Sequence, residues 1–135
     1  MKDDKTTLGD VYEVFSLLRK IYFTQDKQER DFPFNLKYKL TKILFYFQDD
    51  GGMIDEKRSE LIMELGQDVG DGLYTVKQEN ADEFRKRFTE MTNTAHLGEM
   101  SYPRLTLQEM NDIAAIAPAL TGTEVLIADR FLLEK

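Results

Sequence analysis

The chain has 135 residues and a formal net charge of −7, with 32% charged and 41% hydrophobic residues. It contains no cysteine, no tryptophan and a single histidine. Disulfides, thiolate metal sites, cysteine nucleophiles and any chemistry that needs two histidines are therefore excluded. The length fits one domain, residues 1–135, that is large enough to build its own core.

The charge is unevenly distributed along the chain. Residues 1–48 hold nine basic and seven acidic side chains, whereas residues 49–135 hold nine basic and eighteen acidic ones. Since an acidic chain repels phosphate, we expect no nucleic-acid partner. No apolar run approaches the roughly 20 residues that span a bilayer, and Met1–Lys5 is too polar to begin a signal peptide. We therefore expect no membrane association, and a location in a cytoplasm or inside an assembled particle.

Helical spacing of apolar residues predicts a first helix over 8–24, with Thr6 or Thr7 as its N-cap. A polar stretch and the segment Phe32-Pro33-Phe34 follow. Because proline disfavours helix at the residue before it, this segment is predicted to be a loop. We expect both phenylalanines to pin that loop onto the core.

The next segment predicts one long helix over 35–66. Positions 40, 44, 47, 51, 54, 58, 61 and 65 advance by threes and fours without a slip, and six of these eight residues are apolar. Glycine is poor in a helix interior, so Gly51-Gly52 is expected to bend or weaken the helix. The alternative is two helices joined tightly at the glycines.

Residues 66–72 read as a turn, and the β-branched and aromatic segment 73–76 reads as a strand. A helix over 81–92 follows, opened by a capping box of Asn80 and Glu83. Residues 97–104 predict a second strand, which could pair with the first across that helix. Two further boxes, Thr106–Glu109 and Thr121–Glu124, each open a short helix. The expected fold class is α+β, mainly α, with a two-stranded β element and strand–helix–strand–helix–helix order over 73–133.

Five segments stand in a familiar order along the chain: Leu36–Lys42, Glu56–Leu61, Gly72–Val76, Glu79–Phe84 and Leu120–Glu124. Over about residues 34–133, this order resembles a group of small tailed-bacteriophage proteins of uncharacterised function. The resemblance implies a phage source. It brings no established activity, cofactor or site residue with it.

Motifs for catalysis and cofactor binding are sparse. His96 and Glu99 could share a metal weakly, but one imidazole is too few for a transition-metal site, and we interpret His96 as a surface or edge-strand residue. Glu56, Glu60 and Glu64 stand four residues apart, a pattern that can hold a hard cation together with Asp49 or Asp50 but is also typical of a solvated helix face. No phosphate-binding glycine loop is present. We therefore expect no cofactor, no metal and no enzymatic activity.

Aromatic residues beside lysines in segment 34–47 are the better clue, because such clusters are typical of protein-contact hot spots. The candidate contact residues are Tyr38, Lys39, Lys42, Phe45 and Tyr46. The alternative is a helix packed between two others within one chain.

Three functional hypotheses follow from these features. The first is a non-enzymatic phage protein that acts through protein contacts, as a virion component or assembly factor, in the virion or the host cytoplasm. Its partner would be a phage or host protein, or a second copy of the chain. The second is an acidic phage effector that binds and inhibits a host protein. The third is a small carboxylate or metal-dependent enzyme.

Overall fold

The computed structural model describes residues 6–135, so the polar segment Met1–Lys5, on which the expectation of no signal peptide rests, lies outside the described residues. The elements, in chain order, are α1 (Leu8–Tyr22), α2 (Phe34–Leu65), β1 (Gly66–Gly70), β2 (Leu73–Val76), a 3₁₀ turn η1 (Gln78–Asn80), α3 (Ala81–Thr92), α4 (Leu107–Ala114) and α5 (Gly122–Phe131). The predicted fold class, α+β and mainly α, is confirmed. No helix within residues 6–135 combines the length and the apolar character needed to cross a membrane.

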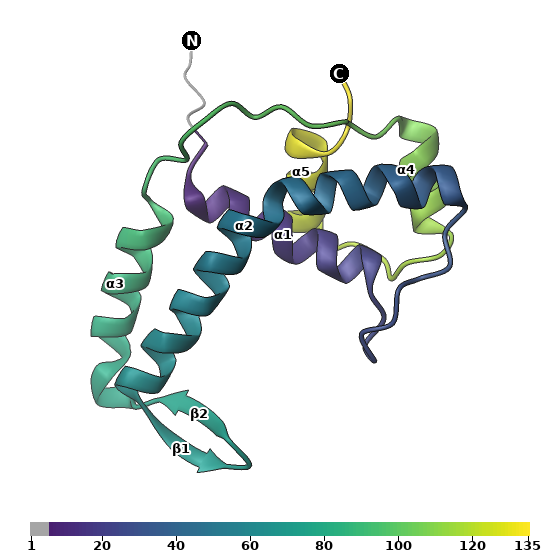
Figure 1. The fold of residues 1–135 in the computed structure, drawn as a ribbon. Helices are drawn as coiled ribbons and strands as arrows, with labels where there is room; N and C mark the ends of the chain where they lie inside the picture. The colour runs from purple at the N-terminus through teal and green to yellow at the C-terminus, as the bar shows by residue number, and fades with distance from the viewer. Residues whose placement is uncertain (1–5) are drawn as a thin grey trace.

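The long helix is confirmed as α2, which runs unbroken through the two glycines. The alternative of two helices is therefore wrong. Figure 1 shows a bend near the middle of α2, the part of the helix that carries Gly51 and Gly52. Gly51 is buried, and a Cβ on it would lie only 2.4 Å from Cγ of Phe15. Glycine is needed here because the aromatic ring of α1 rests directly on the backbone of α2.

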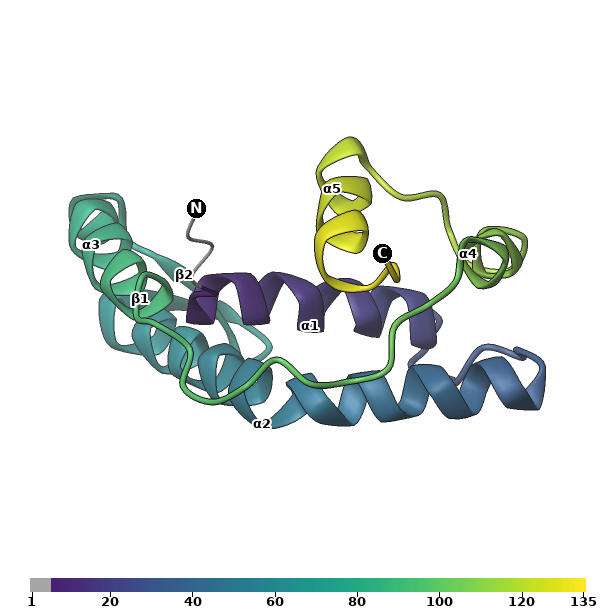
Figure 2. The same ribbon diagram turned by 90° about the horizontal axis from the view of Figure 1, so that it is seen from above.

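The main core lies where α1 packs against the first half of α2 and against α5, an arrangement visible in Figure 2. The seven buried side chains of α1 follow the predicted helical spacing: Val11, Val14, Phe15, Leu17, Leu18, Ile21 and Tyr22. The C-terminal end closes this core with Leu132, which is completely buried, as is Leu105. The Leu105 N–H donates to the Leu132 carbonyl at 2.6 Å, so the chain end is tied down by backbone hydrogen bonding.

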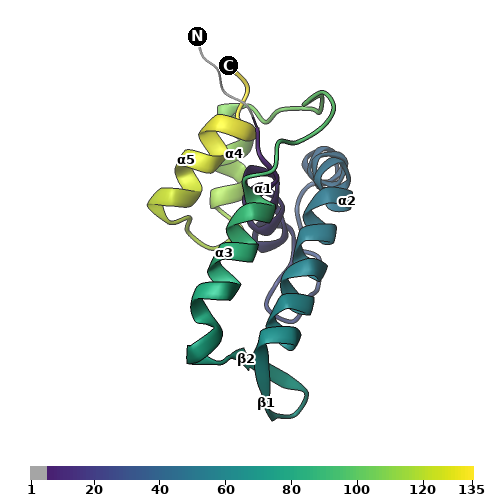
Figure 3. The same ribbon diagram turned by 90° about the vertical axis from the view of Figure 1, so that its left-hand side faces the viewer.

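Residues 52–92, which we call the distal arm, extend away from this core (Figures 1 and 3). The arm comprises the second half of α2, the β1–β2 hairpin and α3. Its two buried side chains are Ile54 and Leu61, and no residue from 62 to 104 is buried. Phe84 and Phe88, which we predicted as the buried edge of α3, are only half-buried. The arm is therefore much more thinly packed than the core.

The predicted second strand over 97–104 is wrong, and so is its pairing across α3. The strand paired with β2 is β1, Gly66–Gly70, the segment that we predicted as a turn. Residues 97–104 instead run as an extended segment with Gly98 at φ +98° and Pro103, which has no N–H to donate. Side chains hold the segment in place: Tyr46 Oη donates to the Glu99 carbonyl, and Tyr102 Oη donates to the Phe131 carbonyl at 2.7 Å.

The helix caps follow the sequence in two of the three predicted capping boxes. The boxes Thr106–Glu109 and Thr121–Glu124 are both formed, and Thr7 caps α1 with Asp10 in the same way. The box predicted for Asn80 is wrong. The Asn80 side-chain amide instead donates to the Leu65 carbonyl at 2.8 Å, satisfying the C-terminal end of α2. Asn80 therefore closes the base of the hairpin and does not cap α3.

We predict that Gly51→Ala destabilises the protein, because the new methyl group must displace the Phe15 ring. Overpacking of this kind costs roughly 1–3 kcal/mol. Gly52→Ala is the matched control, since a Cβ there meets no atom within 4 Å. Alanine should then raise stability by up to about 1 kcal/mol, its advantage over glycine in a helix. Chemical denaturation of the two variants measures the difference, and equal effects would contradict the role given to Gly51.

A second prediction concerns the two capping glutamates. Burial opposes ionisation of Glu109 and Glu124, but hydrogen bonds from Lys39 and Lys20, and from the Thr106 and Thr121 caps, outweigh it and lower each pKa. A carboxyl group with a lowered folded-state pKa stabilises the fold above its unfolded pKa, and this stabilisation is lost as the pH falls through the folded pKa. Stability should therefore decline below about pH 4.5.

The double variant Glu109→Gln, Glu124→Gln should show a shallower decline in an acid titration of the free energy of unfolding. At neutral pH it should lose roughly 1 kcal/mol or less for each partly exposed ion pair. Glu79→Gln, on the exposed turn η1, is the control and should keep the wild-type profile. An unchanged decline in the double variant would contradict the assignment.

Candidate protein-contact surface

The first half of α2 carries a row of exposed aromatic side chains. Phe34, Tyr38 and Phe45 are 81%, 57% and 64% exposed. Their spacing of four and seven residues places them within roughly 40° of one another around a helix. The Phe34 and Tyr38 rings stack with their centroids 6.3 Å apart, and Lys42 Nζ lies 5.7 Å from the Tyr38 ring centroid. We call Phe34, Tyr38, Lys42 and Phe45 the aromatic face.

The structure gathers three of the five predicted contact residues and places the other two elsewhere. Tyr38, Lys42 and Phe45 belong to the aromatic face. Lys39 lies on a different side of α2, with its Nζ 2.9 Å from Glu109 Oε1 of the cap of α4. Tyr46 packs inward, with its ring centroid 4.9 Å from that of Tyr102. Lys39 and Tyr46 are therefore engaged in contacts within the chain and lie outside the aromatic face.

Phe34 is the residue that sequence reasoning missed. We expected it to pin the loop onto the core, as Phe32 does, but Phe32 is buried and Phe34 is the most exposed of the aromatic face. Phe34 is the first residue of α2, directly after Pro33. Its four-residue spacing to Tyr38 is the signal that could have found it, because that spacing puts both rings on one helix face.

A groove of about 440 Å³ lies between α1 and α2 beside the aromatic face, and Phe45 belongs to both. Its wall is mostly apolar or aromatic, with Arg19, Glu29, Thr41 and Gln48 as the polar residues; the rest of the lining is Phe15, Tyr22, Phe23, Leu44 and Phe45. The Arg19 guanidinium carbon lies 5.5 Å above the Phe15 ring centroid. The groove therefore offers an apolar cleft with a cation at its edge.

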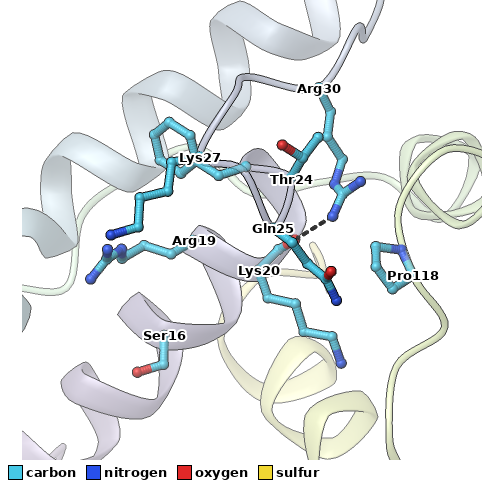
Figure 4. A pocket seen from close by; sticks show the side chains of 9 residues that line it. Ser16, Arg19, Lys20, Thr24, Gln25, Lys27, Arg30 and Pro118 are labelled. Atoms are coloured by element: carbon cyan, nitrogen blue, oxygen red, sulfur yellow. Dashed lines mark hydrogen bonds between the residues drawn. The ribbon is translucent and has the colours of Figure 1, made fainter. Parts of the chain in front are cut away.

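A shallow basic pocket of about 610 Å³ adjoins the groove and shares Arg19 and Phe23 with it. In the view of Figure 4, Arg19 and Lys27 extend in the same direction, while Lys20 points away toward α5. Lys20 Nζ is engaged there with Glu124 Oε1 at 2.7 Å. Arg30 donates from Nε to the Ile21 carbonyl at 3.1 Å, which holds its guanidinium in place. No carboxylate lines this pocket.

The acidic residues of α2 do not form a continuous acidic surface. Glu64 is ion-paired with Arg87 of α3, and Glu60 lies 3.5 Å from Lys57 Nζ. The Arg87 guanidinium lowers the pKa of the Glu64 carboxyl. Within residues 6–135, no three histidine, aspartate or glutamate side chains come together in a way that could hold a metal ion.

His96 is not the surface or edge-strand residue that we predicted. Its side chain is only 8% exposed, and Nε2 lies 3.2 Å from Asp50 Oδ2. The His96 backbone N–H donates to the Thr6 carbonyl at 2.9 Å. His96 therefore joins the segment after α3 to the middle of α2 and to the residues that precede α1.

A second apolar groove of about 180 Å³ lies between α4 and α5. Leu107, Met110 and Val125 are among its lining residues, and Leu126 of α5 is 71% exposed. This groove is smaller, and Asp129 is the charged residue in its lining. It provides exposed apolar side chains remote in sequence from the aromatic face, which are useful as controls.

No family model, curated protein or solved structure matches this chain.

Proposed function

We propose that this chain is a non-enzymatic protein of a tailed bacteriophage that acts through protein contacts, as a virion component or assembly factor. The observation that carries the proposal is the aromatic face, three exposed aromatic rings and a lysine aligned on one side of α2. The phage source is supported by the sequence resemblance over about residues 34–133. The protein partner is a phage or host protein or a second copy of the chain.

The energetics of the aromatic face support a docking role. Burying one large apolar side chain contributes roughly 1.5–3 kcal/mol, so three such rings supply a large part of the free energy that a specific contact needs. Phe34 and Tyr38 already stack on each other, which limits the side-chain entropy lost when a partner binds. Lys42 beside the Tyr38 ring adds a positive charge that favours an acidic partner surface.

The alternative of an acidic effector that imitates nucleic acid receives less support. Imitation of nucleic acid requires a run of negative charge, but Glu60 and Glu64 on α2 face Lys57 and Arg87. The described carboxylates likewise do not converge on one point as a metal-dependent site requires. Neither the acidic effector nor the metal-dependent enzyme accounts for the exposed aromatic face.

We predict that the triple variant Phe34→Ser, Tyr38→Ser, Phe45→Ser keeps its fold but loses its partner. All three side chains are exposed, so the free energy of unfolding should change by about 0.5 kcal/mol or less for each substitution. The measurement is affinity capture with the tagged chain from phage-infected cells, with mass spectrometry of the captured proteins. Virion or assembly proteins should be retained by the wild type and lost by the variant.

The matched control is Leu107→Ser, Val125→Ser, Leu126→Ser, which removes the same number of exposed apolar side chains from α4 and α5. It should capture the same proteins as the wild type. Equal capture by the wild type and the aromatic-face variant would contradict the proposal. The position of the gene beside head or tail genes is an independent test of the assembly role.

A further inference from the structure

The β1–β2 hairpin is a projecting element with little to stabilise it (Figures 1 and 3). Every residue from Gln67 to Thr75 is exposed, and Leu73 remains 64% exposed. An isolated two-stranded hairpin is marginally stable in water, and apolar side chains at such a tip normally pack against something. Val69, Leu73 and Tyr74 pack poorly within the described chain, which points to a docking element.

The hairpin tip is acidic and preorganised. Residues 66–76 contain Asp68 and Asp71 and no cation. Asp68 Oδ1 accepts a hydrogen bond from the Gly70 N–H at 2.8 Å, and Asp71 adopts a left-handed conformation with φ +53° between two positive-φ glycines. Within residues 6–135, neither aspartate forms an ion pair. The tip therefore presents two carboxylates beside exposed apolar side chains.

The surface that complements this tip is the groove and the basic pocket at the other end of the α1–α2 pair. The groove offers a mostly apolar wall, in which the Glu29 carboxylate is paired with Lys37. Arg19, Lys27 and Arg30 line the adjoining pocket, but Arg19 lies 3.9 Å from Asp55 and Arg30 donates to backbone carbonyls, which leaves Lys27 as the cation available to a partner. Lys27 pairs with no carboxylate among residues 6–135. Apolar side chains beside carboxylates thus match an apolar cleft whose adjoining pocket carries Lys27, which is the charge pattern of a complementary interface.

We infer that the hairpin tip of one copy docks into the groove and basic pocket of a second copy. No hairpin residue lines the groove or the pocket of its own chain, so the contact joins different molecules. Because the tip and the groove are different surfaces, two copies can exchange the contact reciprocally in a closed dimer, or the contact can extend head to tail into a larger ring or a filament. The inference rests on the proposed function, because Phe45 of the aromatic face also lines the groove.

The test uses charge reversal with complementation, read as the mass of the particles by size-exclusion chromatography with light scattering. The particle mass of the wild type should exceed the 15.7 kDa of one chain. It should increase as the protein concentration is raised toward about 1 mM, which is the Kd of a weak contact. Lys27→Glu and Asp71→Lys should each weaken association about tenfold, because each places like charges across the contact. An equimolar mixture of the two variants should restore association, since the reversed tip now meets the reversed pocket.

Lys86→Glu and Asp112→Lys are the controls, because they make the same charge changes on the exposed surfaces of α3 and α4. Asp71→Asn is a second tip variant, since asparagine tolerates the left-handed conformation while removing the charge. It should also weaken association. A mixture that fails to associate, or variants that associate as the controls do, would overturn the inference.

A monomeric wild type would also overturn the inference. The proposed function would then still be tested separately, by the capture of other proteins through Phe34 and Tyr38.

The lack of cysteine in the chain allows a second measurement of the contact, by disulfide cross-linking. Lys27→Cys mixed with Asp71→Cys should form a disulfide-linked dimer, whereas Lys27→Cys mixed with Asp112→Cys should not; equal yields would contradict the contact.

Discussion

The contact between the Phe15 ring and the backbone at Gly51 is the constraint on which the rest of the structure depends. A Cβ at position 51 would overlap the ring at 2.4 Å, so α1 can reach this point of α2 only because the residue is glycine. The contact brings α1 against α2 at the part of the helix that bends (Figure 1). Residues before it, such as Ile43 and Phe47, join the main core, whereas Ile54 and Leu61 lie outside that core. One small residue thus separates a core from a distal arm.

The distal arm is held by a few apolar contacts, among them the edge-on packing of Tyr12 of α1 on Phe88 of α3, and by exposed polar contacts. The Leu65 carbonyl, left without a partner in α2, accepts from both the Lys77 backbone N–H and the Asn80 side chain. The Arg87–Glu64 ion pair joins α3 to α2 across an open surface. Exposed contacts of this kind contribute little stability, so the arm should open locally at a lower free energy than the core. Elements that bind partners are commonly drawn from such regions of low stability, which is consistent with the docking that we infer for the hairpin.

The sequence predicts the helices, including α3 with no buried residue, and the exposed strand β2, and it fails at β1 and at residues 97–104. The unbroken phase of apolar residues across Gly51-Gly52 was sufficient to predict α2, and the spacing of threonine and glutamate predicted the caps at Thr106 and Thr121. The strand Gly66–Gly70 was missed because it is polar, glycine-rich and exposed, so no alternation marks it. Residues 97–104 looked like a strand, but they are held by hydrogen bonds to distant elements, from Tyr46 of α2 and to the Phe131 carbonyl of α5, which local pattern cannot show. Likewise, the sequence does not show that Lys39 forms an ion pair within the chain while Lys42 belongs to the aromatic face, because this depends on where Glu109 lies in space.

The aromatic face lies on the half of α2 before the bend, and the hairpin follows the half after it. The contact at Gly51 therefore bears on how the two surfaces are oriented relative to each other. A straight helix of 32 residues would span about 48 Å, and the bend sets the direction in which its second half leaves the core. In a head-to-tail contact each copy is rotated relative to the last by the angle between its tip and its groove. Whether such a series closes into a ring or continues as a filament depends on that rotation alone. The Phe15 ring therefore does more than fill the core, because in the head-to-tail contact that we infer, the bend beside which it packs would set the geometry with which successive copies meet.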